Sequence, residues 1–157
     1  MAGGRLAWPV LAVALLASGC LGSGGSSSGS SSPRLTVAEY RTQASAICAT
    51  YRHRIAALGT PSDLQALAVA GSKAIDLQAA EVRELRALRP PQSEAGKVDS
   101  MLDAVDRGIR IGRELVSAAR KGDTAAVMDA VPRLQGKLEA ANRLARGLRL
   151  GTCAIVG

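Results

Sequence analysis

Thr36-Val37-Ala38-Glu39 is the stretch at which this 157-residue sequence becomes helical. A Thr followed three positions later by Glu is a capping box, in which the two side chains satisfy free backbone amides of the first turn. Apolar side chains then recur at steps of three and four, at Val37, Tyr40, Ala44, Ile47, Tyr51, Ile55 and Leu58. This spacing predicts an amphipathic helix that ends at Gly59.

Two further segments show the same helical spacing. Thr60-Pro61-Ser62-Asp63 predicts the start of a second helix, with Pro at the first helical position, and Pro90-Pro91 marks its end. Its stripe consists of Leu64, Leu67, Gly71, Ile75, Gln78, Val82, Leu85 and Leu88. A third helix is expected from about Ser93 to Arg120, where Lys121-Gly122 provides the stop.

Asp123 can cap a fourth helix, which continues to Leu148. Pro132 lies inside this pattern and lacks a backbone N–H, so we expect a kink or a short break there. No segment alternates in the manner of a strand. The sequence therefore predicts an all-α fold, an antiparallel up-down four-helix bundle whose alanine- and glycine-rich seams give a thin core.

Residues 11–20 read Leu-Ala-Val-Ala-Leu-Leu-Ala-Ser-Gly-Cys, after a single positive charge at Arg5. An apolar run of this length is too short to span a bilayer and is typical of a signal-peptide core. Its end resembles the lipobox of bacterial lipoproteins, although Ala17 stands where that motif usually has Leu. The resemblance implies that Cys20 receives a diacylglycerol, becomes the first residue of the mature chain and anchors it on the extracytoplasmic face of the cell membrane.

Residues 22–32 contain only glycine and serine. Such a segment cannot bury apolar surface, so we expect a disordered, flexible tether closed by Pro33. The alternative for residues 11–20, a buried core helix, is disfavoured because this following segment could not pack against it. The predicted organisation is a signal peptide over 1–19, the lipidated cysteine and tether over 20–35, and the helical domain over 36–157.

The three cysteines fit an exported chain. If Cys20 carries lipid, Cys48 and Cys153 remain as an even pair in an oxidising compartment, where we expect a disulfide. Two buried free thiols are the alternative. Such a bridge would matter greatly for a thin core, because it closes a loop of about a hundred residues.

Short motifs around both cysteines resemble small exported helical proteins of actinobacteria, whose function is unassigned. They are Ala44-Ser45-Ala46-Ile47-Cys48, Ala141-Asn142-Arg143-Leu144-Ala145 and Leu150-Gly151-Thr152-Cys153. The resemblance implies the same pairing of the early cysteine with the terminal one. It departs at Pro132 and brings no catalytic residues to this chain.

Composition argues against two classes of function. The formal net charge is +7, but the chain has one Trp, two Tyr and no Phe, too few aromatic rings to bind nucleic acid by base stacking. His53 is the only histidine and has no neighbouring ligand motif, so we interpret it as a surface residue. We therefore expect no catalytic residues, no metal and no cofactor, and the chain is predicted not to be an enzyme.

Arginines form the one charged pattern of interest. Asp103 and Asp106 precede Arg107 and Arg110 by four positions and can pair with them along one helix. A second set has no acidic residue four positions away and lies near the ends of the second and fourth helices: Arg83, Arg86, Arg89, Arg146 and Arg149. These cations either stabilise the helix dipole alone or form an anion-binding surface. In an up-down bundle they would gather at the end where the first helix begins.

Together these features predict a lipid-anchored, non-catalytic binding or interaction module of the cell envelope. An anionic lipid, an envelope polymer or a protein is the expected partner. The alternative is a small-ligand carrier or sensor with a pocket inside the bundle. A cavity of a few hundred cubic ångströms would favour the carrier, and a filled core with an exposed charged patch would favour the interaction module.

Overall fold

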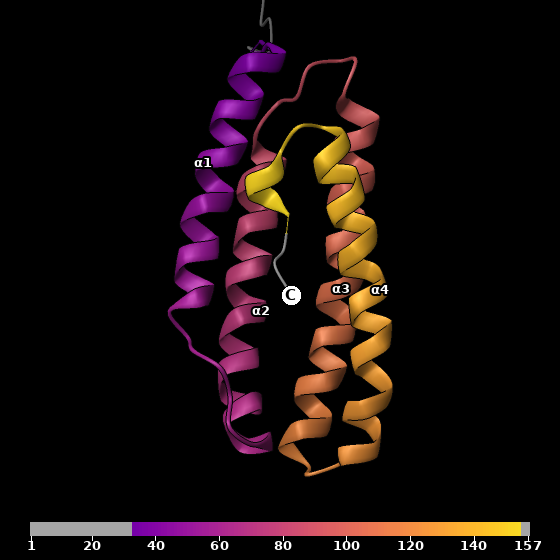
Figure 1. Cartoon of the computed structure of the whole chain (residues 1–157). Helices are drawn as coiled ribbons and strands as arrows, with labels where there is room; N and C mark the ends of the chain where they lie inside the picture. Colours follow the sequence, from indigo (N-terminus) through magenta and orange to yellow (C-terminus); the bar gives the residue numbers. More distant parts are fainter. Residues whose placement is uncertain (1–32, 155–157) are drawn as a thin grey trace, which may run out of the picture. The chain divides into compact units, whose positions relative to one another are not determined.

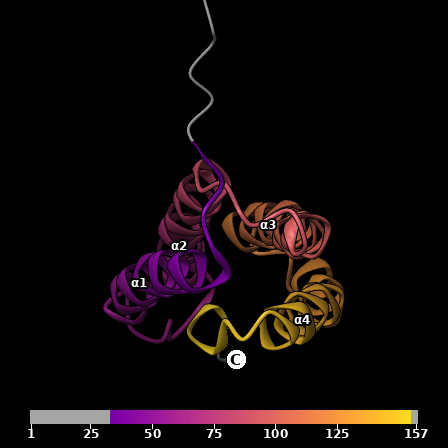
Figure 2. The same cartoon turned by 90° about the horizontal axis from the view of Figure 1, so that it is seen from above.

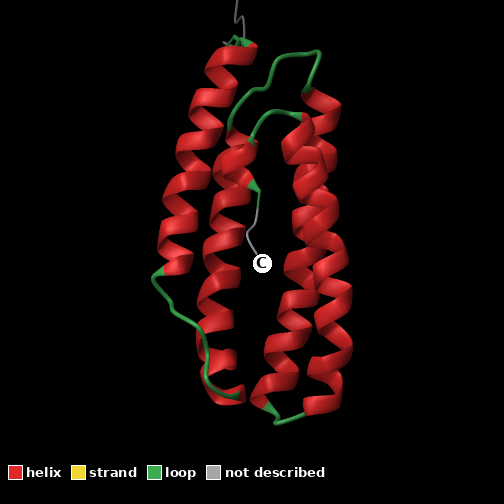
Figure 3. Cartoon of the chain, in the orientation of Figure 1, coloured by secondary structure: helices red, strands yellow, loops and turns green. Residues whose placement is uncertain are grey.

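A computed structural model describes residues 33–154 of the chain. The helices are α1 (Val37–Ala56), α2 (Leu64–Ala87), α3 (Ala95–Arg120), α4 (Thr124–Gly147) and a short 3-10 turn, η1 (Gly151–Cys153) (Figure 1). No strand occurs between residues 33 and 154, as Figure 3 shows, so the predicted all-α fold is confirmed. Cys20, the signal segment and the glycine-serine tether lie outside the described residues. None of the helices in the described range combines the length and apolarity that crossing a bilayer requires.

Polar caps set the starts of three helices. The Thr36 hydroxyl accepts a hydrogen bond from the Glu39 amide at 3.3 Å, and the Glu39 carboxylate accepts one from the Thr36 amide at 2.8 Å. The predicted capping box is therefore confirmed. Asp123 caps α4 as predicted, because its carboxylate accepts a hydrogen bond from the Ala126 amide at 3.0 Å.

The start of α2 differs from the prediction. Asp63, rather than Thr60, is the capping residue, and its carboxylate accepts a hydrogen bond from the Ala66 amide at 2.8 Å. Asp is the better cap of the two, since its charge also interacts favourably with the helix dipole. Residues 57–63 therefore form a longer connection than predicted, with Gly59 at a φ of 73°.

Successive helices run antiparallel, and α1 packs on α2, α2 on α3, and α3 on α4 (Figure 1). The last pair of the ring is different, because α1 and α4 make almost no direct contact. Instead η1 lies between them and packs on both, as the view along the helices shows (Figure 2). The bundle is therefore closed on this side by the C-terminal turn and not by helix-to-helix packing.

Glycine allows α2 and α3 to approach closely. A Cβ atom on Gly71 would lie 2.9 Å from Val116 Cγ2, and one on Gly112 would lie 3.3 Å from Ile75 side-chain atoms. Both distances are shorter than ordinary van der Waals contact between carbon atoms. The predicted thin, glycine-containing seam is thus a real close approach at these two positions.

Pro132 does not interrupt α4, which is one continuous helix. Of the two outcomes expected there, the short break is wrong. Pro132 leaves the carbonyl of Met128 without its helical donor, and Met128 is exposed at 68% of its surface. Water can therefore satisfy that carbonyl, which explains why the helix continues.

Candidate functional site

After α4 the chain reverses direction through a left-handed residue. Arg149 has a φ of 59°, and the Leu150 amide donates to the Ala145 carbonyl at 2.8 Å. This is the hydrogen bond of a Schellman motif, a common way to end a helix. Leu150 is fully buried, so the reversal is held by packing as well.

The reversal brings Cys153 against α1, where it forms a disulfide with Cys48. The Cα atoms of the two residues lie 4.9 Å apart. The predicted bridge is therefore confirmed. Because Cys153 ends η1, the bridge also fixes this turn between α1 and α4.

A cavity of about 360 Å³ lies beside the disulfide. We call it the C-terminal groove. Its walls come from α1, α2 and the C-terminal turn, and the lining residues are Cys48, Arg52, Ile55, Ala56, Ala74, Gln78, Glu81, Thr152, Cys153 and Ala154. Small-molecule sites commonly have volumes of about 300–1,000 Å³, so the groove is within the range for a ligand.

A second cavity of about 200 Å³ adjoins the groove, and the two share Ala74 and Gln78. Glycine and aliphatic residues of α2, α3 and α4 provide the rest of its lining: Leu67, Gly71, Ile75, Gly108, Ile109, Gly112, Leu115, Val116, Leu134 and Leu138. We call this second cavity, which lies next to the groove, its apolar extension.

Few polar groups line the C-terminal groove. Glu81 forms no hydrogen bond or ion pair with any residue between 33 and 154. The Thr152 hydroxyl is buried and has no hydrogen-bond partner in the described part of the chain. Gln78 lies between these and the apolar extension, and Arg52 is exposed. A mostly apolar cavity with a few unsatisfied polar groups is the usual character of a binding site.

Burial raises the pKa of Glu81 to about 7, and the negative charge of Glu84 contributes in the same direction. Glu84 in turn accepts a hydrogen bond from the Tyr51 hydroxyl on α1. Near neutral pH the Glu81 carboxyl therefore exists in both protonation states. A carboxyl group with a raised pKa inside a cavity is a recognised sign of a functional site.

Glu81 was not among the residues that the sequence pattern singled out. Gln78 already occupied a position in the apolar stripe of the second helix, and Glu81 follows it three residues later on the same side of the helix. The available signal was the pair of polar side chains, Gln78 and Glu81, in consecutive turns on the core-facing side of the helix. Only the tertiary structure shows that neither side chain finds a hydrogen-bond partner among residues 33–154.

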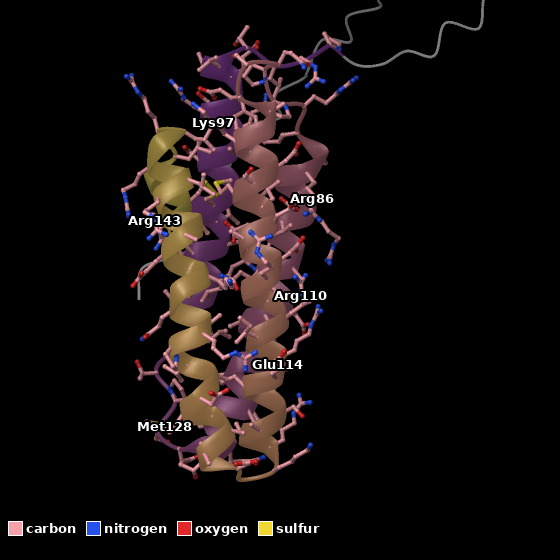
Figure 4. The ribbon with its side chains drawn as sticks, turned by 90° about the vertical axis from the view of Figure 1, so that its right-hand side faces the viewer. Arg86, Lys97, Arg110, Glu114, Met128 and Arg143 are labelled. Carbon is pink, nitrogen blue, oxygen red and sulfur yellow. A yellow bond between two sulfur atoms is a disulfide. The ribbon has the colours of Figure 1, made fainter. Side chains whose placement is uncertain are left out.

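The C-terminal ends of α2 and α4 lie at the end of the bundle where α1 begins (Figure 1). The five arginines near those ends, which we call the basic end, are all exposed: Arg83, Arg86, Arg89, Arg146 and Arg149. Lys97, in the first turn of α3, lies at this end too (Figure 4). Arg34 donates to the Pro90 carbonyl at 3.0 Å, and Arg41 is paired with Glu94 at 2.7 Å.

One member of the basic end is neutralised in a way the sequence did not predict. Arg86 contacts Asp106 at 2.6 Å and Asp103 at 3.1 Å, across the α2–α3 interface. Pairing of these two carboxylates with Arg107 and Arg110 along α3 had been expected. They pair with Arg86 of α2 instead. Helix packing brought an opposite charge closer than the one four residues away.

The remaining candidate residues are structural or exposed. Tyr40 is completely buried and Tyr51 nearly so, as expected for core positions. His53 is exposed, in agreement with its interpretation as a surface residue. Between residues 33 and 154 no group of three or more His, Cys, Asp or Glu side chains could hold a metal ion.

Comparisons of this chain with protein-family models, with curated proteins and with solved structures find no match.

Proposed function

We propose that this chain is a lipid-anchored, non-catalytic binding protein of the extracytoplasmic membrane face, and that its C-terminal groove holds a small, mainly apolar ligand. The observation that carries the proposal is the cavity of about 360 Å³ beside the Cys48–Cys153 bridge. A cavity of that size favours a carrier or sensor over a bundle with a filled core. The glycine-lined extension next to it would give room for an elongated apolar group that passes Ala74 and Gln78.

The wall of the groove also supports ligand binding. η1 separates α1 from α4, and the disulfide fixes η1 in that position. A preformed cavity avoids the cost of ordering a site when the ligand binds. The lining is mostly apolar with few polar groups, which supports binding of a small molecule.

The groove can be tested with N-phenyl-1-naphthylamine, an uncharged apolar dye whose fluorescence rises in apolar surroundings. Ala74 borders both cavities, so Ala74→Leu places extra side-chain volume where the dye would lie. We expect the variant to bind the dye at least about tenfold more weakly than the parent chain, since a filled cavity excludes it. Ala87→Leu, at an exposed position of α2, is the matched control and should bind as the parent does.

Equal dye binding by the parent chain and Ala74→Leu would contradict the groove as the site. Thermal unfolding of each variant checks that weaker binding does not result from loss of the fold.

The anchor is tested separately. Intact mass of the membrane fraction should show a chain that starts at Cys20 and bears acyl groups, and Cys20→Ala should abolish both processing and anchoring. A soluble, unacylated product of the unaltered gene would refute this part of the proposal.

The basic end suggests a second role, contact with anionic headgroups or an anionic envelope polymer. Arg146 and Arg149 are exposed at the end of the bundle from which residue 33 enters α1. Cations close to an anionic bilayer contribute about 1 kcal/mol each. A lipid-anchored domain could therefore be oriented by this end while the groove remains accessible.

A further inference from the structure

The C-terminal groove contains one acidic side chain, and no cation of the described residues is paired with it. Glu81 lines the groove together with Gln78, one turn earlier on α2, and with Thr152 of the C-terminal turn. A carboxylate that is largely removed from water and lacks an ion-pair partner is costly for the protein. A positively charged ligand would remove that cost.

We propose that the groove selects amphipathic amines, with the ammonium group at Glu81 and the apolar chain along Ile55, Ala74 and the glycine-lined extension. This inference rests on the proposed function, because it names the class of ligand for the same groove. A primary ammonium group has three N–H donors and no acceptor. The Glu81 carboxylate and the Gln78 side-chain carbonyl are acceptors on two residues that line one cavity, so an ammonium N–H has two acceptor side chains available there.

Thr152 also lines the groove, from the C-terminal turn. Its hydroxyl oxygen is buried and forms no hydrogen bond with residues 33–154. Because this oxygen has no surface open to the groove, the groove offers a ligand the other atoms of Thr152, and Glu81 and Gln78 provide the acceptors. Glu81 and Thr152 come from segments about seventy residues apart, and only the disulfide-held turn brings them to one cavity.

The other charged groups near Glu81 act in opposite directions. From α1, Arg52 lines the groove and disfavours a cation, but its side chain is exposed and its charge is screened by water. From α2, Glu84 adds negative charge near Glu81. The C-terminal turn contributes no ionisable group to the lining, and neither do α3 and α4, which face Glu81 with Met101, Leu102, Val105 and Ala141.

A dependence on pH follows. The ammonium group of an alkylamine stays protonated up to about pH 10, like that of lysine, so only Glu81 changes charge between pH 5.5 and pH 8. With a pKa of about 7, Glu81 is ionised about thirtyfold more often at pH 8 than at pH 5.5. Amine binding should therefore strengthen by up to about thirtyfold over this interval.

The experiment measures displacement of N-phenyl-1-naphthylamine by decylamine and by 1-decanol at both pH values. The protein is the oxidised full chain with Cys20→Ser, which cannot be acylated. We expect decylamine to compete at least about tenfold better at pH 8 than at pH 5.5, and 1-decanol to show no such gain. Glu81→Gln should bring decylamine to the affinity of 1-decanol and abolish its pH dependence. Glu139→Gln, at an exposed position of α4, is the matched control and should behave as the parent.

The outcomes separate the two proposals. If both probes displace the dye equally at both pH values, the groove binds apolar ligands and the amine proposal is overturned. If decylamine binding keeps its pH dependence in Glu81→Gln, another group recognises the amine and the proposal is likewise overturned. If neither probe displaces the dye and the dye itself does not bind, the proposed function fails. Gln78→Leu provides a second variant, expected to weaken decylamine several-fold and leave 1-decanol unchanged.

Discussion

The Cα atoms of Cys48 and Cys153 lie 4.9 Å apart although 105 positions separate the two residues in the sequence. Cys48 is in the middle of α1, and Cys153 ends the turn that follows α4. The bridge thus joins α1 to η1, which lies between α1 and α4, and it helps to close the bundle where those two helices make almost no direct contact.

Removing this bridge should therefore destabilise the fold strongly. In the chain-entropy model a disulfide that closes a loop of this length stabilises the folded state by at most about 4–5 kcal/mol. We expect Cys48→Ser to lower the melting temperature by roughly 10 °C or more. Calorimetry of the oxidised chain measures the change. Cys153→Ser and the double variant should match Cys48→Ser, since one bridge is lost in each case. If the reduced parent chain had the same melting temperature as the oxidised chain, the prediction would be contradicted.

Glu81 should make stability depend on pH. Its pKa is about 7 in the folded chain against an ordinary value of 4.5, so between these values the folded state binds more protons than the unfolded state. The free energy of unfolding is therefore highest below about pH 4.5, and the contribution of Glu81 to it is lost as the pH rises through 7. Allowing for partial exposure, the loss should be on the order of 2 kcal/mol.

Glu81→Gln should remove this loss, so that the variant is more stable than the parent at pH 8 and similar to it at pH 4.5. Urea unfolding at the two pH values provides the comparison, with Glu139→Gln as the control. An unchanged slope of stability against pH in Glu81→Gln would show that Glu81 is not the titrating group.

Two glycine substitutions should have opposite effects. Gly136 is an exposed position in α4 with open space around it, so Gly136→Ala should stabilise the fold by up to about 1 kcal/mol through helix propensity. Gly71→Ala gains the same propensity, but its Cβ would lie 2.9 Å from Val116 Cγ2, on a short branched side chain that cannot move aside easily.

Overpacking of this kind costs about 1–3 kcal/mol, so Gly71→Ala should be less stable than Gly136→Ala by at least about 1 kcal/mol. Chemical denaturation of the two variants measures the difference directly. Equal stabilisation by both substitutions would mean that α2 and α3 can separate without cost.

The basic end should bind anionic vesicles. Replacing Arg146 and Arg149 by Gln removes two exposed cations from this end, and we expect vesicle binding to weaken roughly thirtyfold at low salt, at about 1 kcal/mol per charge. The matched control is Arg107→Gln with Arg110→Gln, which removes two exposed cations from the middle of α3. Co-sedimentation with vesicles containing phosphatidylglycerol measures both. Salt-insensitive binding, or equal loss in the control, would exclude a role for this end.

Much of the architecture could be predicted from the sequence because helical periodicity and capping are local. Thr36 with Glu39, and Asp123 with the amides that follow it, form their hydrogen bonds within one turn, so their sequence spacing was sufficient. The pairing of Cys48 with Cys153 was also predictable, since few cysteines are present. The cap at Asp63 and the continuous helix through Pro132 were not, because they depend on competing caps and on solvent access.

The sequence by itself determined the helices, their order and the residues that could bridge. Only the tertiary structure decided that η1 separates α1 from α4, that a groove remains beside it, and that Glu81 lines this groove without a partner among residues 33–154. It likewise decided that Asp103 and Asp106 pair with Arg86. The physical reason is that local hydrogen bonds and periodicity depend on residues a few positions apart. Cavities, unpaired buried groups and cross-helix ion pairs depend on which distant surfaces come together when the chain packs.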